Sequence, residues 1–363
     1  MKRNIKVIVL SHLPLPYHKI GSWTNRYDHY IKNSTKIDAI ICPKPVLEEY
    51  QKEYLFTKEP ILHKINVKLK NDRFYHFIMS FSEYIAKYPK SSFVVQIIDN
   101  FGLVKSLINY IIKHDLRNRI YLQYSYHGHE LFANKEDTKF VFQHINEILF
   151  LTTSAVNANL EKFSVLPQYV SISSNGIDTS LFNTDKRINN ADKTTFLWCS
   201  QDRPKKGLHI ILDVWEKFHQ NYPFTELLIV GTGNEIKARG TKVIGKVENK
   251  NLPNIYKRSD VYLFPTQWEE PFGLTLIEAL HCGCFCIASK LGGVPEVLNN
   301  GEFGWLINKP ENSENWYKAM VKYIEEKPTL NKIPVKKFNL EKWSQNMDSI
   351  LEKAKKRLET ISK

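Results

Sequence analysis

The sequence predicts an α/β protein built from two Rossmann-like domains, each with a parallel sheet. Short apolar runs alternate with longer amphipathic segments along the whole chain, which is typical of βαβ units. The length of 363 residues exceeds what one hydrophobic core usually organises. A polar stretch with turn residues, 183–193, separates two such series and places the domain boundary near residue 185.

The apolar runs locate the expected elements. In the first half, strands are predicted at 5–11, 37–42, 93–98, 120–126, 148–152 and 169–173, with helices at 103–113 and 140–147. In the second half, strands are predicted at 195–199, 226–230, 242–244, 261–264, 285–288 and 304–307, with helices at 208–220, 274–281 and 314–325. A charged amphipathic helix is expected over 340–361. The predicted domains are therefore 1–185 and 186–338, followed by a C-terminal helix within 339–363 that could pack back on the N-terminal domain.

Composition bounds the class of protein. Apolar residues make up 42% of the chain and aromatic residues 12%, which is enough to bury two cores and argues against disorder. The basic start resembles a signal peptide, but its apolar run is short and broken by Lys6, so we expect a buried strand. No apolar stretch approaches the ~20 residues that a membrane span needs. Cys282, Cys284 and Cys286 are interpreted as buried thiols in a reducing cytoplasm, because strand alternation would send Cys284 to the opposite face and prevent convergence on one metal.

The net charge of +13 predicts an acidic partner. Residues 1–165 carry 23 Lys and Arg against 15 Asp and Glu, so the excess lies mainly in the first half. No zinc-finger spacing, RNA-recognition motif or basic heptad pattern is present, so we expect no nucleic acid. An anionic membrane surface that carries a lipid-linked acceptor fits the basic, aromatic first half, and a merely solvated basic surface is the alternative.

The most informative string is EPFGLTLIE, residues 270–278. It follows the predicted strand 261–264 and opens the predicted helix 274–281. The backbone N–H groups of Gly273, Leu274 and Thr275 would therefore form an anion site for a diphosphate at a helix N-terminus. Glu270 precedes this site and Glu278 lies further along the helix, so the two carboxylates address different parts of one ligand.

This Glu-x7-Glu string resembles the donor-site motif of the family-4 retaining glycosyltransferases, the glycosyl transferases group 1 of GT-B architecture. The resemblance covers most of the chain and is densest from 175 to 296. It implies two Rossmann-like domains facing each other across a deep cleft, with the nucleotide on the C-terminal domain. By this resemblance Glu270 would contact the transferred sugar, Glu278 the ribose hydroxyls, and Lys206 of the string PKKG, 204–207, the donor diphosphate.

Further residues follow from the same resemblance. Many relatives have an Arg where this chain has Ser200, and Arg203 is the candidate to replace it. The backbone at Gly245 and Val247 falls where relatives bind the base. Gly21 lies in the place of a glycine-rich loop near the diphosphate. In the N-terminal domain His127 resembles a histidine that lies beside the donor sugar and the acceptor, with His129 as the alternative.

The resemblance implies a retaining transfer of a hexose-type sugar from a UDP or GDP donor to a hydroxyl of a glycan or lipid-linked acceptor. The expected setting is bacterial surface polysaccharide or lipopolysaccharide synthesis, in the cytoplasm or at the inner face of the cell membrane. The sequence contains no Asp-x-Asp, so we expect neither a metal nor a cofactor besides the nucleotide-sugar co-substrate. Two alternatives are a sugar-nucleotide epimerase of the same architecture, which needs no acceptor, and a scaffold that binds sugar nucleotides without turnover.

Overall fold

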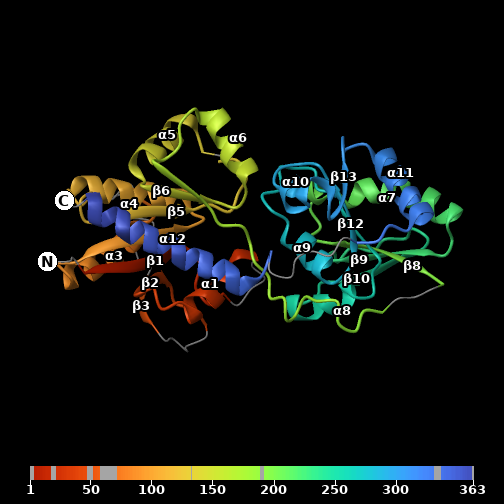
Figure 1. Ribbon diagram of the computed structural model, residues 1–363, viewed down its shortest axis with the longest axis horizontal. Helices are drawn as coiled ribbons and strands as arrows, with labels where there is room; N and C mark the ends of the chain where they lie inside the picture. The colour runs from red at the N-terminus through yellow and green to blue at the C-terminus, as the bar shows by residue number, and fades with distance from the viewer. Residues whose placement is uncertain are drawn as a thin grey trace. The chain divides into compact units, whose positions relative to one another are not determined.

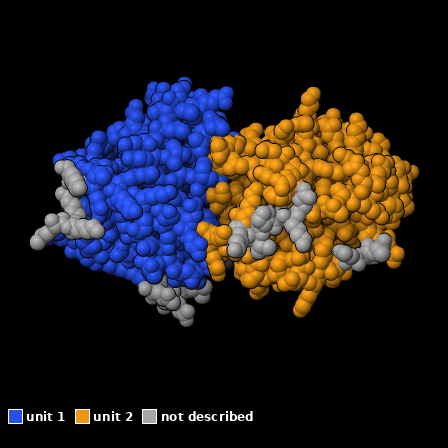
Figure 2. All heavy atoms as spheres, in the orientation of Figure 1, with its two compact units in different colours: residues 1–151, 155–173, 343–363 blue, residues 152–154, 174–342 orange. Residues whose placement is uncertain are grey.

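A computed structural model describes residues 4–17, 22–46, 52–57, 72–131, 133–188, 192–330 and 337–361 (Figure 1). The chain divides into two compact units, coloured separately in Figure 2. Unit 1 comprises residues 1–151, 155–173 and 343–363, and unit 2 comprises 152–154 and 174–342. Among the described residues, no helix combines the length and apolar character needed to cross a membrane.

Unit 1 is built on a parallel sheet that has seven strands among the described residues, in the order β3-β2-β1-β4-β5-β6-β7. The strands are β1 Ile5–Ser11, β2 Ala39–Pro43, β3 Glu53–Thr57, β4 Ser92–Ile98, β5 Ile120–Ser125, β6 Glu147–Phe150 and β7 Tyr169–Ile172. The helices are α1 Ser22–Asn33, α3 Tyr75–Lys87, α4 Phe101–Lys113, α5 Lys135–His144, α6 Thr153–Phe163 and α12 Leu340–Ile361. Every residue of β4 is buried, as expected for a central parallel strand covered on both faces.

Five elements of unit 1 depart from the prediction. The helix expected at 140–147 begins earlier, at Lys135, because Asn134 caps it by accepting from the Asp137 N–H at 2.8 Å. Strand β3 and helices α1, α3 and α6 were not predicted. β3 is an edge strand of five residues with an exposed end, too short for a clear apolar run. α1 buries mainly aromatic rings, Trp23, Tyr27 and Tyr30, with Ile31 as its buried aliphatic side chain.

Unit 2 contains a second parallel sheet, six-stranded among its described residues, in the order β10-β9-β8-β11-β12-β13. The strands are β8 Thr194–Cys199, β9 Thr225–Val230, β10 Thr241–Gly245, β11 Val261–Phe264, β12 Phe285–Ser289 and β13 Gly304–Ile307. The helices are η1 Pro204–Lys206, α7 Leu208–Asn221, η2 Asn249–Asn251, α8 Leu252–Tyr256, α9 Leu274–His281, α10 Val294–Val297, η3 Asn299–Gly301 and α11 Ser313–Glu326. The predicted strands agree with these bounds to within one residue. The three predicted cysteines are buried and free, but only Cys286 lies in a strand, since Cys282 ends α9.

The structure divides the chain after Ser173, ahead of the predicted boundary near residue 185. Residues 174–185 stay with unit 2, in which the Ile177 N–H donates to the Phe338 carbonyl at 2.8 Å. The Leu340 N–H in turn donates to the Ile177 carbonyl at 2.9 Å. From Trp343 onward the C-terminal helix belongs to unit 1, where the Trp343 Nε1–H donates to the Ser173 Oγ at 3.0 Å.

A buried carboxylate holds α12 on the sheet of unit 1. Glu147, only 1% exposed at the start of β6, pairs with Arg357 of α12 at 3.0 Å. The same carboxylate accepts from Ser171 at 2.6 Å, from Gln123 at 2.9 Å and from Tyr121 at 3.2 Å. A buried charge is tolerated only when it is paired and hydrogen-bonded, so this network keeps α12 attached to the sheet.

We expect Arg357→Ala to lower the free energy of unfolding of unit 1 by about 3 kcal/mol, because it leaves Glu147 buried without its cation. Urea unfolding followed by tryptophan fluorescence and by circular dichroism measures the change. Lys353→Ala, at an exposed position of the same helix, is the matched control and should alter stability by less than about 0.5 kcal/mol. Equal effects of the two substitutions would show that the network contributes nothing.

Candidate active site

Three loops of unit 2 meet at the carboxyl ends of its central strands. They follow β8, β11 and β12, which are neighbours in the sheet. The Gln267 N–H donates to the Lys205 carbonyl at 2.8 Å, which joins the first loop to the second. The Gly293 N–H donates to the Glu270 carbonyl at 2.8 Å, which joins the second to the third. In open parallel sheets this edge is where ligands bind.

Lys206 and Glu270, predicted from separate motifs, form an ion pair in this place. The Lys206 Nζ lies 2.6 Å from the Glu270 Oε2, and both side chains are largely buried. The Trp268 Nε1–H donates to the same oxygen at 2.8 Å. Trp198 also donates its indole N–H, at 3.1 Å, to the Lys206 carbonyl, which fixes the main chain of the lysine. Both donors to Glu270 hold one carboxylate oxygen, so the position of the carboxyl group is fixed.

A second ammonium lies beside this pair. The Lys205 Nζ lies 3.6 Å from the centroid of the Trp268 ring, and the Lys206 Nζ lies 5.3 Å from it. Burial, followed by the neighbouring charge of Lys206, lowers the pKa of Lys205. Two adjacent cations held by one carboxylate and one aromatic face make a site suited to an anion.

Helix α9 points its N-terminus into the same loop. Its N-cap is Gly273, in the left-handed region at φ 86°, and no side chain caps the helix. The first-turn N–H groups of Leu274 and Thr275 belong to the end of a helix that favours negative charge. The Thr275 hydroxyl faces inward and accepts from Tyr262 at 2.8 Å, so only the backbone of Thr275 is directed to a ligand.

Glu278 has a different environment from Glu270. It is 6% exposed, accepts from Asn249 at 3.2 Å and from the Tyr256 hydroxyl at 3.2 Å. Burial raises the pKa of Glu278 to about 7, against which these two hydrogen bonds act. A carboxyl group with this pKa changes charge near neutral pH.

The remaining predicted donor residues of unit 2 lie on neighbouring loops. Arg203 is exposed, precedes η1 and borders a hollow of about 450 Å³ with Asp202, His209 and Asn234. Gly245 ends the edge strand β10 at φ 82°, and its carbonyl accepts from the Gly231 N–H at 2.8 Å. Val247 follows it in a loop and is half-buried between exposed neighbours.

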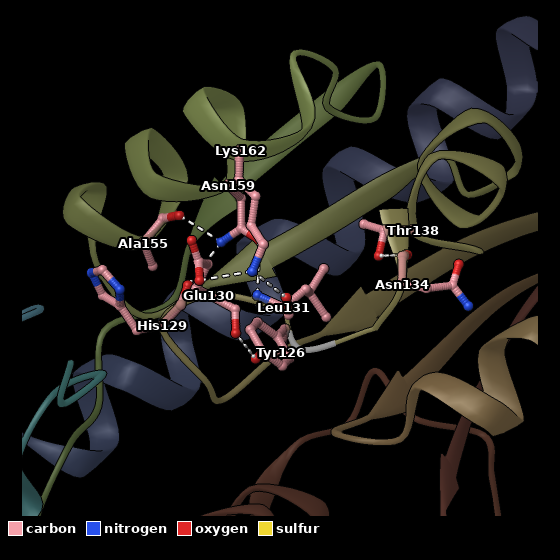
Figure 3. Close-up of polar contacts among 9 residues, drawn as sticks. All are labelled: Tyr126, His129, Glu130, Leu131, Asn134, Thr138, Ala155, Asn159 and Lys162. Carbon is pink, nitrogen blue, oxygen red and sulfur yellow. Dashed lines mark hydrogen bonds and ion pairs between the residues drawn. The ribbon is translucent and has the colours of Figure 1, made fainter. Parts of the chain in front are cut away.

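In unit 1 the structure distinguishes the two candidate histidines. His129 is buried, and its carbonyl accepts from Asn159 of α6 at 2.8 Å (Figure 3). Asn159 also accepts from the Leu131 N–H at 3.1 Å, and Lys162 pairs with Glu130 at 2.8 Å, so this loop is fixed from one side (Figure 3). The predicted Gly21 lies outside the described residues.

His127 lies at the carboxyl end of β5 and is half-buried. Its backbone N–H donates to the Asp99 carboxylate at 3.1 Å, and its ring Nε2 lies 3.4 Å from the Ser125 Oγ. Burial and the nearby Arg26 charge hold the pKa of His127 well below its usual range, so the ring is neutral. A neutral imidazole at this edge can accept a proton or a hydrogen bond.

Comparisons with known proteins identify the family of the segment that carries these residues. Residues 182–337 match the family described as glycosyl transferases group 1. This segment belongs to that family. It contains Lys206, Glu270 and Glu278. Among the described residues of the whole chain, no group of three His, Cys, Asp or Glu side chains could hold a metal ion.

Curated relatives match less than half of this chain. The phosphatidyl-myo-inositol mannosyltransferase of Mycobacterium tuberculosis is 32% identical over 144 residues, 37% of this chain and 38% of the relative. The gpi3 subunit of phosphatidylinositol N-acetylglucosaminyltransferase from Schizosaccharomyces pombe is 25% identical over 171 residues, 44% of this chain and 37% of the relative. The match thus spans well under half the length of these relatives.

Solved structures match the fold over nearly the whole chain. Sucrose-phosphate synthase from Thermosynechococcus elongatus has a TM-score of 0.73 at 16% identity, covering 96% of this chain and 98% of that one. The Anabaena protein HepE in complex with UDP has a TM-score of 0.73 at 14% identity, covering 96% of this chain and all of that one. These structures confirm the predicted α/β fold class of GT-B type.

Several residues of the site were missed from the sequence. Trp268 holds Glu270 and faces Lys205, while Asn249 and Tyr256 hold Glu278. Trp268 lies two residues before Glu270 and directly before Glu269. An aromatic residue this close to the donor-site motif was a sequence signal for a contact with Glu270. Asn249 and Tyr256 lie more than twenty positions from Glu278, so only the fold brings them to it.

Glu278 makes stability depend on pH. Its pKa rises from 4.5 in the unfolded chain to about 7 in the folded protein, so between these values the folded state holds a proton that the unfolded state has lost. Stability from this residue is therefore complete below pH 4.5 and is lost as pH rises to 7, by up to about 3 kcal/mol. We expect Glu278→Gln to gain stability relative to the native protein across this window, as measured by thermal unfolding at pH 5, 6, 7 and 8. A stability difference that stays constant with pH would contradict the environment described for Glu278.

Proposed function

We propose that the protein is a retaining glycosyltransferase that takes a sugar from a nucleoside-diphosphate donor bound on unit 2. The observation that carries the proposal is the Lys206–Glu270 pair beside Lys205 and the N-terminus of α9, at the carboxyl ends of β8 and β11. Cations and free helix N–H groups suit a diphosphate, and a fixed carboxylate suits a sugar that develops positive charge.

Each residue has a role in this proposal. The Lys206 ammonium neutralises the diphosphate, whose negative charge grows as the bond to the sugar breaks, and the N–H groups of Leu274 and Thr275 share that charge. Glu270 stabilises the positively charged sugar ring through the oxygen that Lys206 and Trp268 leave open. Glu278 accepts hydrogen bonds from the ribose hydroxyls, with the base near Gly245 and Val247.

The proposed reaction proceeds on one face of the sugar. The bond between the anomeric carbon and the leaving phosphate oxygen breaks, and a bond from the acceptor hydroxyl oxygen forms on the same side. The acceptor proton passes to the leaving phosphate, so Glu270 need not act as a nucleophile, in contrast to retaining glycosidases. The route uses Lys206 and the helix N-terminus to neutralise phosphate charge and calls on no metal or other cofactor.

The relatives support the choice of substrates. UDP is bound in the Anabaena structure, which supports a uridine donor, and a GDP donor is the other option. The names of the mycobacterial and Schizosaccharomyces pombe relatives contain phosphatidyl-myo-inositol and phosphatidylinositol, which supports a lipid-linked acceptor. A glycan acceptor in surface polysaccharide or lipopolysaccharide synthesis is the other option. The charge of +13 favours peripheral contact of the protein with the anionic inner face of the cell membrane.

The first test is a panel of UDP-, GDP-, ADP- and dTDP-sugars without acceptor, followed by thermal shift and by nucleotide release. We expect one donor to stabilise the protein and to release its nucleotide slowly by hydrolysis. Lys206→Ala should abolish both effects, whereas Lys217→Ala, at an exposed position of α7, should abolish neither. A donor sugar converted to its epimer without nucleotide release would support an epimerase, and binding without any turnover would support a scaffold.

The second test separates the role of Glu270, which faces the transferred sugar, from that of Trp268, which fixes Glu270. We expect Glu270→Gln to lower turnover by about 100-fold or more, because it removes the charge that stabilises the transition state. Trp268→Phe keeps the ring that faces Lys205 but removes the N–H that fixes Glu270, so kcat should fall about tenfold with KM for the donor little changed. Near-normal kcat in Glu270→Gln would refute the site, and a change confined to KM in Trp268→Phe would refute the positioning role of Trp268.

A further inference from the structure

Arg26 of α1 is a buried cation without a hydrogen-bond partner among the described residues. Arg26 is only 5% exposed, and its Nε and Nη1 are buried and have no hydrogen-bond partner. Buried guanidinium groups are ordinarily paired, since an uncompensated buried charge is costly. Unit 1 itself shows the ordinary case in Arg357, which pairs with Glu147 at 3.0 Å.

Contacts within unit 1 place Arg26 at the carboxyl ends of its central strands. The next residue, Tyr27, donates its hydroxyl to the Ser125 Oγ at the end of β5, at 2.8 Å. Trp23, one turn earlier, lies 5.7 Å from the His127 ring between centroids. The Arg26 Cζ itself lies 5.7 Å from the Trp343 ring, so an aromatic face supports the guanidinium without satisfying its N–H groups.

The acidic neighbour of Arg26 is an incomplete counterion. Asp99, after β4, interacts with Arg26 through charge and not through a hydrogen bond, and its Oδ1 accepts from the His127 N–H. Burial raises the pKa of Asp99 to about 6, and burial lowers the pKa of Arg26 to about 9. The charge of each group is thus poorly stabilised by the other, so a further negative group beside Arg26 would be favourable.

Two imidazole nitrogens border the same place. His12 follows β1 and His127 follows β5, and in each ring the buried Nδ1 has no partner among the described residues. The Trp23 ring contacts both, with centroids 6.0 Å from His12 and 5.7 Å from His127. His12, Asp99 and His127 are half-buried, so each of these residues is partly open to solvent.

We propose that Arg26, flanked by His12 and His127, binds an anionic group of the sugar acceptor on unit 1. The proposal rests on the function proposed above, because it names the chemistry of the acceptor for that reaction. A phosphate and a carboxylate both offer two coplanar oxygens to the planar guanidinium, which binds such groups by two parallel hydrogen bonds. The shared requirement is an oxyanion, carried either by a phosphorylated acceptor or by an acidic sugar.

The test uses the Lys206→Met protein as its background, so that phosphate binding on unit 2 is suppressed. Inorganic phosphate and sodium glucuronate are titrated separately by calorimetry, at an ionic strength held constant with sodium chloride. We expect the background protein to bind one or both anions, and addition of Arg26→Met to weaken that binding by about tenfold or more. Lys32→Met is the matched control, because Lys32 is an exposed cation of the same helix that pairs with Asp28, and it should leave anion binding unchanged. A response to phosphate alone assigns a phosphorylated acceptor, and a response to glucuronate alone assigns an acidic sugar.

Equal anion affinity with and without Arg26→Met, or no binding of either anion by the background protein, would overturn the inference. Thermal unfolding without anion tests the same claim independently of ligand. Removal of an unpaired buried charge should leave the melting temperature of Arg26→Met equal or raised, whereas a fall would show that Arg26 has a structural partner. Arg26→Gln serves as a second variant for the titrations if the Met variant does not fold. Nucleotide binding by the native protein and by Arg26→Met reports on unit 2 alone: its absence from both refutes the donor site without bearing on Arg26.

Discussion

The close approach of two main-chain segments is the constraint on which the site of unit 2 depends. Gly207 adopts φ 72°, and a Cβ placed on it would lie 1.8 Å from the Pro265 carbonyl oxygen. Only glycine allows this contact, and it is the contact that brings the turn ending in Lys206 against the loop that carries Glu270. Gly292, in the loop after β12, allows a second close approach, because a Cβ there would lie 2.4 Å from the Glu270 carbonyl oxygen. The carboxylate is therefore positioned by backbone packing before any side-chain pairing.

Much of this arrangement follows from the sequence because it is local. Parallel strands buried on both faces appear as uninterrupted apolar runs, and the string from Glu270 to Glu278 contains its own turn and helix start. Trp268 was missed because a single tryptophan in a loop is equally compatible with core packing. Asn249 and Tyr256 were missed because their distance to Glu278 is set by the course of β10 and α8, which the order of residues does not reveal.

Unit 1 was harder to predict for a physical reason that also marks its site. α1 has few aliphatic residues, so its helical period is carried by Trp23, Tyr27 and Tyr30, which apolar-run counting overlooks. Aromatic side chains with polar ends suit the rim of a binding site, where one end is packed and the other reaches a partner. Arg26 thus lies on α1, one of the helices that the sequence did not predict.

The polar groups buried in unit 1 fall into two kinds. Glu147 is surrounded by donors on β5, β7 and α12, and every one of these interactions remains inside the protein. The Nε and Nη1 of Arg26 and the Nδ1 of His127 have no such partners among the described residues, although these atoms are also buried in unit 1. Folding alone explains the first kind, since a closed network holds α12 on the sheet. The second kind lowers the stability of the free protein. Such unpaired groups are expected where a bound ligand supplies the missing hydrogen-bond partner.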